Sequence, residues 1–98
     1  MTTTGNEFLT TLETVIQKRL EAPVEGSYTS QLSADGAQRI AQKVGEEAVE
    51  LVLASVGGDR AATINEAADL LYHVLVLLNF QDIRLADVVA ALETRHRT

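Results

Sequence analysis

Apolar residues recur along this 98-residue chain at intervals of three and four, the spacing of one face of a helix. Pro23 follows the first apolar stretch as a stop, and Asp59 is well placed to cap the third. No stretch alternates with period two. The pattern therefore predicts an all-α bundle of about four antiparallel helices. These helices are predicted over residues 6–22, 37–55, 59–80 and 85–95.

The second stretch predicts a helix whose apolar face carries Ile40, Ala41, Val44, Ala48, Leu51 and Val52. The segment before it is less regular. Pro23 and Gly26 predict a loop, and "TSQLSADG" predicts no more than one short turn of helix. The third stretch is apolar nearly all round in its second half, which predicts a helix covered on several sides.

Length and charge set the class of protein. Residues 1–98 are long enough for a single domain whose core is thin, so dimerisation is expected to complete the bundle. A net charge of −6 argues against nucleic acid as a partner, because phosphate backbones attract Lys and Arg. The longest apolar run, residues 70–78, is far shorter than the roughly 20 residues of a membrane helix. Without cysteine or a signal-like N-terminus, the cytoplasm is the expected location.

Carboxylates form two stripes that border the predicted core. On the second helix the stripe has the spacing i, i+3, i+4 and i+7, and on the third helix i, i+3 and i+7. A short loop joins these helices, so they are expected to pack antiparallel with their stripes facing across one groove. The first stripe holds Lys43, Glu46, Glu47 and Glu50, and the second holds Glu66, Asp69 and His73.

A stripe of Glu on a helix is commonly solvated surface, and Lys43–Glu47 is an ordinary i, i+4 pair. Two facing acidic stripes are harder to explain in this way. Two like charges about 4 Å apart repel by about 4 kcal/mol at an effective dielectric constant near 20. Since a small domain is stabilised by only about 5–15 kcal/mol, the carboxylates must separate, take up protons or bind a cation.

An all-oxygen set of ligands suits Mg²⁺, with Mn²⁺ as a possible substitute, better than Zn²⁺. Magnesium commonly bridges protein carboxylates to the phosphates of a substrate, which would let this acidic chain hold a polyphosphate. Water bound to such an ion can attack a phosphoryl group. The acids therefore indicate metal-dependent hydrolysis of a phosphoanhydride, without naming the substrate.

The motif "EEAVE" followed by "EAAD" resembles the E-E-x-x-E … E-x-x-D signature of the all-α, MazG-like nucleotide pyrophosphohydrolases. The wider context "GSYTSQL", "KVGEEAVEL" and "EAADLLYHVLVLL" is similar to the phosphoribosyl-ATP pyrophosphohydrolase family of histidine biosynthesis, over nearly the whole chain. The resemblance implies a MazG-like dimer and Mg²⁺-dependent hydrolysis of phosphoribosyl-ATP to phosphoribosyl-AMP and pyrophosphate. Some relatives are fused to the next enzyme of the pathway, whose zinc ligands have no counterpart here, so a stand-alone form is expected.

The resemblance also assigns roles to the acids and to the lysine. Glu47, Glu50, Glu66 and Asp69 match the metal-binding acids of the family. Glu46 matches the first acid of the pair, either as a further ligand or as the group that orients the attacking water. Glu46, Glu47 and Glu50 are therefore the expected catalytic acids. Lys43 is expected to face the phosphates.

The remaining candidates have two interpretations each. His73 could contact phosphate or hydrogen-bond a carboxylate, but a histidine in an apolar run can equally be a satisfied core residue. Ser27, Tyr28 and Thr29 could simply start a helix, while the resemblance implies a role in binding substrate or closing the site. Tyr28 is also the candidate for stacking on a base.

Two other functions stay open from the sequence. An enzyme of the same superfamily could instead clear non-standard nucleoside triphosphates, in which case it should accept free dNTPs. Alternatively, the chain could be a non-catalytic helical dimerisation module with a solvated acidic face. In that case Mg²⁺ should not change its melting temperature.

Overall fold

The computed structural model describes residues 5–97, and these contain five α-helices and no β-strand. The prediction of an all-α fold is confirmed, and the four predicted helices end within about one or two residues of the observed bounds. The fifth helix is the short one between the first two long ones. The helices are α1 (Gly5–Glu21), α2 (Tyr28–Asp35), α3 (Ala37–Val56), α4 (Arg60–Phe80) and α5 (Leu85–His96).

The prediction of a single short turn before α3 was wrong, because α2 has eight residues and therefore two turns. The Ser27 side chain caps this helix by accepting a hydrogen bond from the Ser30 N–H. Leu32 is the only long apolar residue of α2 and is 2% exposed, so the helix is held by tertiary packing rather than by an apolar periodicity.

Gly36 joins α2 directly to α3. Its backbone, at φ 93° and ψ 176°, lies in a region essentially restricted to glycine. The Gly36 N–H donates to the Leu32 carbonyl at the end of α2, and its own carbonyl accepts from the Ile40 N–H at the start of α3. One residue thus ends one helix and starts the next, which fixes the direction of α2 relative to the acidic helix α3.

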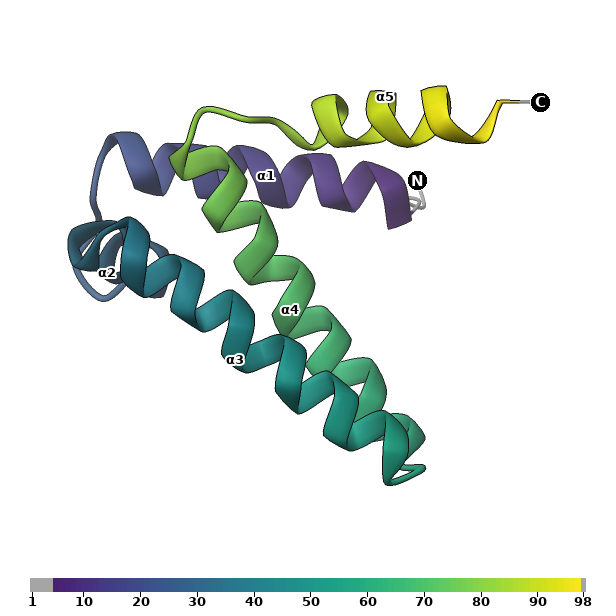
Figure 1. The fold of residues 1–98 in the computed structure, drawn as a ribbon. Coiled ribbons are helices and arrows are strands. Elements are labelled where there is room, and N and C mark those ends of the chain that lie inside the picture. The colour runs from purple at the N-terminus through teal and green to yellow at the C-terminus, as the bar shows by residue number, and fades with distance from the viewer. Residues whose placement is uncertain (1–4, 98) are drawn as a thin grey trace.

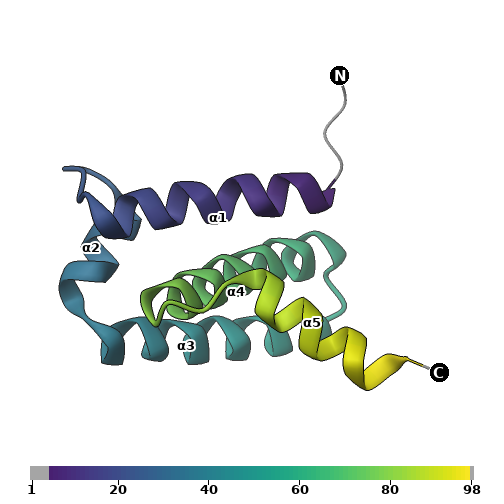
Figure 2. The same ribbon diagram turned by 90° about the horizontal axis from the view of Figure 1, so that it is seen from above.

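The long helices α3 and α4 form an antiparallel hairpin (Figures 1 and 2). Helix α1 contacts α4, and α2 bridges α1 and α3 at one end of the hairpin. The buried core lies at this end and draws on all four of these helices. It consists of Ile16, Leu32, Ile40, Leu75 and Val76.

The other end of the hairpin is poorly covered. Ala41 and Val52, which we predicted on the core face of α3, are exposed, and Val52 keeps 59% of its surface. The most apolar 18-residue window of α4 is only 17% buried. By length and composition alone α4 could cross a membrane, a test that core helices of soluble proteins also pass. The predicted burial of α4 on several sides is thus observed only for part of the helix, around His73 and Val76.

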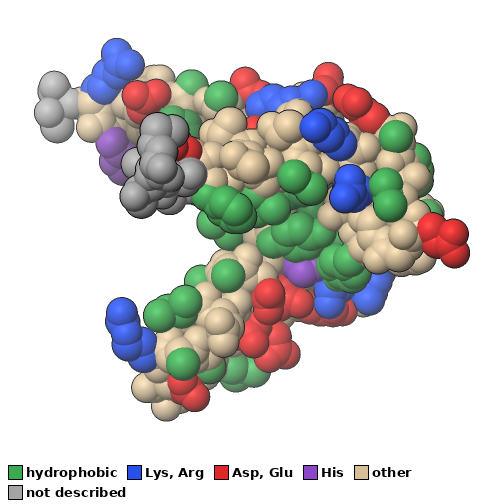
Figure 3. Space-filling model, turned by 180° about the vertical axis from the view of Figure 1, so that it is seen from behind, with side chains coloured by type: hydrophobic (Ala, Val, Ile, Leu, Met, Phe, Trp, Pro, Cys, Tyr) green, Lys and Arg blue, Asp and Glu red, His purple; other side chains and the backbone are tan. Residues whose placement is uncertain are grey.

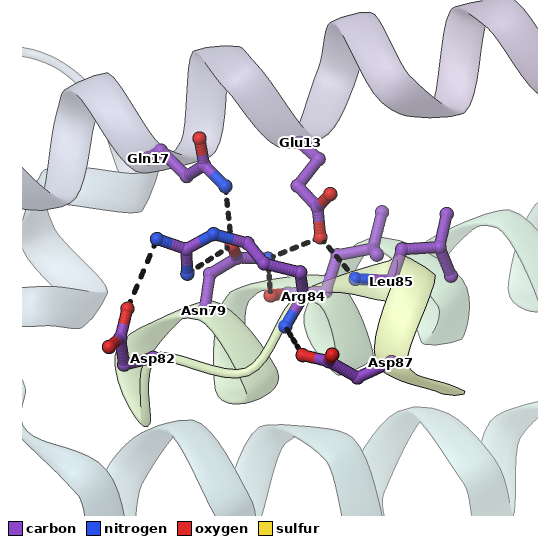
Figure 4. Close-up of polar contacts among 8 residues, drawn as sticks. Glu13, Gln17, Asn79, Asp82, Arg84, Leu85 and Asp87 are labelled. Carbon is purple, nitrogen blue, oxygen red and sulfur yellow. Dashed lines mark hydrogen bonds and ion pairs between the residues drawn. The ribbon is translucent and has the colours of Figure 1, made fainter. Parts of the chain in front are cut away.

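A buried polar cluster fixes the start of α5 to α1 and α4 (Figure 4). Oε2 of Glu13, a residue 8% exposed, accepts hydrogen bonds from Asn79 Nδ2 at 3.0 Å and from the Leu85 N–H at 2.7 Å. Asn79 Oδ1 in turn accepts from Gln17 and Arg84. Apart from this cluster and the packing of Leu85 on the core, α5 contacts the rest of the chain sparsely.

Candidate metal centre

Three carboxylates from the two predicted stripes converge between α3 and α4. One side-chain oxygen each from Glu47, Glu66 and Asp69 lies within 4.8 Å of the others. Glu47 and Glu66 are half-buried and Asp69 is exposed, so the cluster is open to solvent at one side. The antiparallel hairpin brings the stripes together, as the spacing predicted.

The other two acids of the first stripe lie outside this group of three. Glu50 is exposed, but close enough that its charge affects Glu66. The Glu46 carboxylate turns toward the start of α3, where it accepts a hydrogen bond from Gln42 at 2.9 Å and pairs with Lys43 at 3.4 Å. Glu46 therefore lies outside the group of three, although its carboxylate shares Lys43 with that of Glu47.

Desolvation and neighbouring like charges both act on the pKa of Glu66. Desolvation, followed by the charges of Asp69, Glu47 and Glu50, raises the pKa of the Glu66 carboxyl above its ordinary value. For Lys43, burial acts to lower the pKa, but the hydrogen bond to Glu47, the neighbouring Tyr28 and the contacts with Glu46 outweigh it. The net result is a raised pKa, so Lys43 stays charged beside the acids.

These donors fit a hard divalent cation. They are all carboxylate oxygens, and their surroundings raise the pKa of Glu66. Among the described residues, one cation contacts the group: Lys43 lies 3.4 Å from Glu47. Lys43 is also shared with Glu46, so it leaves the charges of Glu66 and Asp69 without an ion pair among the described residues. A divalent ion would relieve the repulsion that adds to desolvation in raising the pKa of Glu66.

The acids lie on an accessible surface. In the space-filling view, acidic side chains gather along the arm formed by α3 and α4, on its side away from the hollow that separates this arm from the one formed by α1 and α5 (Figure 3). Apolar side chains line the base of the hollow. A separate apolar groove of about 470 Å³, between α1 and α5, is lined by Leu9, Glu13, Leu85 and Val89 and contains none of the predicted site residues.

Helix α2 is fastened to α4 next to the acids. His73, 5% exposed, donates from Nδ1 to the Asp69 carbonyl at 2.7 Å, so its Nε2 accepts from the Tyr28 hydroxyl at 2.9 Å. Buried Thr29 shares a hydrogen bond with the Tyr72 hydroxyl. Both nitrogens of His73 are thus used within the chain, as expected of a satisfied core histidine, while Tyr28 remains 48% exposed.

Two groups beside the site were not predicted from the sequence. Arg39 pairs with Glu46 at 3.7 Å, and Gln42 donates to the same carboxylate. Both precede Glu46 at helical spacing, by seven and four residues, so the stripe could have been extended toward the start of the helix. Tyr72, which partners Thr29, gave no comparable signal because it lies within an apolar run.

The raised pKa of Glu66 predicts how pH affects the stability of the metal-free protein. The folded state binds the Glu66 proton more tightly than the unfolded state, so the free energy of unfolding falls as pH rises through the mildly acidic range above the ordinary carboxyl pKa. We expect Glu66→Gln to match the wild type at low pH and to melt at a higher temperature near pH 7.

Differential scanning fluorimetry of both proteins in EDTA, from pH 4 to 8, measures this difference. Groups far from Glu66 titrate equally in both proteins, so the difference between the two reports on Glu66 and on the acids whose charges act on it. Parallel melting curves across the whole range would contradict the raised pKa of Glu66. Adding Mg²⁺ should then stabilise the wild type and not the variant, because the ion requires the deprotonated carboxylate.

Comparison with known proteins connects this geometry to a family. A sequence model described as phosphoribosyl-ATP pyrophosphohydrolase matches residues 9–96. The chain is 52% identical over 87 residues to the phosphoribosyl-ATP pyrophosphatase of Agrobacterium fabrum, covering 89% of this chain and 81% of that protein. It is 54% identical over 89 residues to the histidine biosynthesis bifunctional protein HisIE of Pasteurella multocida, covering 91% of this chain. The chain spans 44% of the length of that bifunctional relative.

Proposed function

The chain belongs to the phosphoribosyl-ATP pyrophosphohydrolase family, and on this premise we propose that it hydrolyses phosphoribosyl-ATP to phosphoribosyl-AMP and pyrophosphate. This is the second step of histidine biosynthesis, in the cytoplasm. The observation that carries the proposal is the convergence of Glu47, Glu66 and Asp69, from two helices, within the region that the family model matches.

In the proposed reaction Glu47, Glu66 and Asp69 would hold Mg²⁺, for which Mn²⁺ could substitute, with Glu50 as a further candidate ligand. The ion supplies neutralisation of phosphate charge and a lowered pKa for a bound water. A water oxygen bonds to the α-phosphorus, the bond from that phosphorus to the bridging oxygen breaks, and the bridging oxygen leaves with pyrophosphate.

Two further acids complete the catalytic proposal. Glu50, exposed beside Glu66, is the proposed acceptor of a proton from the attacking water. Glu46 acts through Lys43, whose ammonium group contacts both Glu46 and Glu47 at 3.4 Å and faces the phosphates. No covalent nucleophile is needed, since hydrolysis of a phosphoanhydride depends mainly on positioning and charge.

We place the nucleoside end of the substrate near the start of α2. Tyr28 is half-exposed and its ring stacks on Tyr72, with centroids 6.1 Å apart, so it presents an aromatic face near the acids. Ser27 and Thr29 hold this helix start in place by capping it and by bonding Tyr72. His73 contributes by fixing the Tyr28 hydroxyl.

Pyrophosphate release tests the function. Phosphoribosyl-ATP, ATP and a panel of dNTPs are incubated with the protein, with and without Mg²⁺. Rapid Mg²⁺-dependent release from phosphoribosyl-ATP alone supports the proposal. Release from dNTPs instead would support the metal site but contradict the proposed substrate. No release from any of them would indicate that the acids are only a solvated face.

We also propose that two copies of the chain pair through the uncovered end of the hairpin. On α3, Val49, Val52, Leu53 and Val56 are 57–84% exposed and have the spacing i, i+3, i+4 and i+7, which forms one apolar stripe. The adjoining part of α4 exposes Ile64 at 54%. A second copy supplies an equal stripe, and the two hairpins together would form a four-helix bundle.

Substitution of one residue tests this pairing. We expect Leu53→Glu to convert a dimer to a monomer, because a charge replaces an apolar contact at the centre of the stripe. Sedimentation equilibrium measures the mass, and Ala91→Glu, which adds the same charge on the exposed surface of α5, is the control. A wild type that is monomeric at micromolar concentration would contradict the pairing.

A further inference from the structure

One face of α3 changes from basic to acidic along its length. Arg39 and Lys43 precede the acids on the same stripe, one helical turn apart. Glu46 lies between the two cations: its Oε2 is 3.7 Å from Arg39 Nη1, and its Oε1 is 3.4 Å from Lys43 Nζ. Lys43 Nζ is also 3.4 Å from Glu47, so the basic groups adjoin the metal centre without a gap.

The contacts of Arg39 contribute little to the stability of the fold. Its side chain is 42% exposed and that of Glu46 is 45% exposed, and ion pairs at such sites are weak. Arg39 also lies in the first turn of α3, where the helix dipole disfavours a cation and favours an anion. A weakly held guanidinium group at the positive end of a helix is therefore available to an incoming anion.

We propose that Arg39 binds the pyrophosphate part of the substrate, the β- and γ-phosphates that leave, and that Glu46 positions Arg39 until substrate arrives. The inference rests on the proposed function. The planar guanidinium group can donate two parallel hydrogen bonds to phosphate oxygens, in place of the weaker pair with Glu46.

The continuity of charge selects this part of the substrate. Glu47 belongs to the group that would hold the metal at the scissile phosphate, and Lys43 contacts Glu47. The carboxylate of Glu46 contacts both Lys43 and Arg39, so it links Arg39 to this group. The β- and γ-phosphates continue directly from the scissile phosphate, so they can lie along this series of side chains. The phosphate on the other ribose is separated from them by two sugars and the base.

Product inhibition tests the assignment. Inhibition by inorganic pyrophosphate and by AMP is measured for the wild type, Arg39→Gln and Arg39→Lys, in Mg²⁺, with phosphoribosyl-ATP as substrate. We expect the inhibition constant of pyrophosphate to rise about 10- to 100-fold in Arg39→Gln, the loss of a hydrogen bond to a charged group. The inhibition constant of pyrophosphate for Arg39→Lys should be intermediate, since lysine keeps the charge but cannot donate two parallel hydrogen bonds. Inhibition by AMP should be unchanged in both variants.

Controls separate this from other effects. Lys18→Gln, in the exposed last turn of α1, removes the same charge and should leave both inhibition constants unchanged. Melting temperatures of the Arg39 variants should equal that of the wild type. An active wild type with unchanged pyrophosphate inhibition in Arg39→Gln, or with altered inhibition by AMP instead, overturns the inference alone. A wild type inactive on phosphoribosyl-ATP overturns the proposed function itself.

Discussion

Replacing Asp69 with Asn is expected to lower Mg²⁺-dependent hydrolysis of phosphoribosyl-ATP by about 10³-fold. A metal ion contributes several kcal/mol of charge stabilisation to a phosphoryl transition state, and each 1.36 kcal/mol corresponds to a factor of ten in rate. Asp69 is one of three converging carboxylates, and Asn keeps its shape but offers a neutral oxygen. The rate is measured as pyrophosphate release at saturating Mg²⁺.

The same substitution should leave the fold intact. The charge of Asp69 raises the pKa of Glu66, so its removal relieves repulsion, and the melting temperature without metal should be equal to or above that of the wild type. The stabilisation by Mg²⁺ should disappear. Glu93→Gln is the matched control, because it removes one exposed carboxylate from α5. An Asp69→Asn protein with wild-type activity would show that the acids hold no catalytic ion.

Replacing Glu13 with Ala is expected to lower the free energy of unfolding by about 2–4 kcal/mol. The substitution leaves the Leu85 N–H and one hydrogen of the Asn79 amide without their acceptor, and each buried group left unpaired costs about 1–3 kcal/mol. For a domain of this size the loss corresponds to a fall in melting temperature of roughly 10–20 °C. Urea denaturation followed by circular dichroism measures the free energy.

Glu13→Gln gives the matched control. Both hydrogen bonds end on the same oxygen, Oε2, so a glutamine whose carbonyl oxygen takes that place keeps both of them and loses only the charge. It should therefore cost much less than Glu13→Ala. Equal effects of the two substitutions would contradict a role based on hydrogen bonding, and would point to the buried charge itself.

The long helices and the acidic stripes could be predicted because their signals are local. Residues on one helix face recur at fixed spacing, and Asp59 caps α4 through the Ala62 N–H as expected. The attachment of α5 could not be predicted, because Glu13 and Asn79 are 66 residues apart. A signal was present nonetheless: Glu13 lies on the apolar face of α1, between Leu12 and Ile16, where an unpaired carboxylate would be costly.

Within the site, spacing identifies the face of the helix but not the direction of each side chain. Glu46 and Glu47 are adjacent in sequence and fall on one stripe, yet only Glu47 meets the acids of α4. Gln42 lies four residues before Glu46 and holds its carboxylate, and this hydrogen bond also lowers the pKa of Glu46. A choice between two side-chain directions depends on such neighbours, which the acidic motif alone does not include.

The hydrogen bonds of His73 limit what Tyr28 can recognise. A carbonyl oxygen cannot donate, so the bond from Nδ1 to the Asp69 carbonyl fixes the tautomer of the neutral imidazole, and the single phenol proton of Tyr28 is committed to Nε2. Tyr28 then offers solvent only lone pairs. Phosphate oxygens would be repelled by these, while a ribose hydroxyl or the amino group of a purine could donate to them. In the proposed site, Tyr28 would therefore discriminate the sugar and base of the substrate from its phosphates.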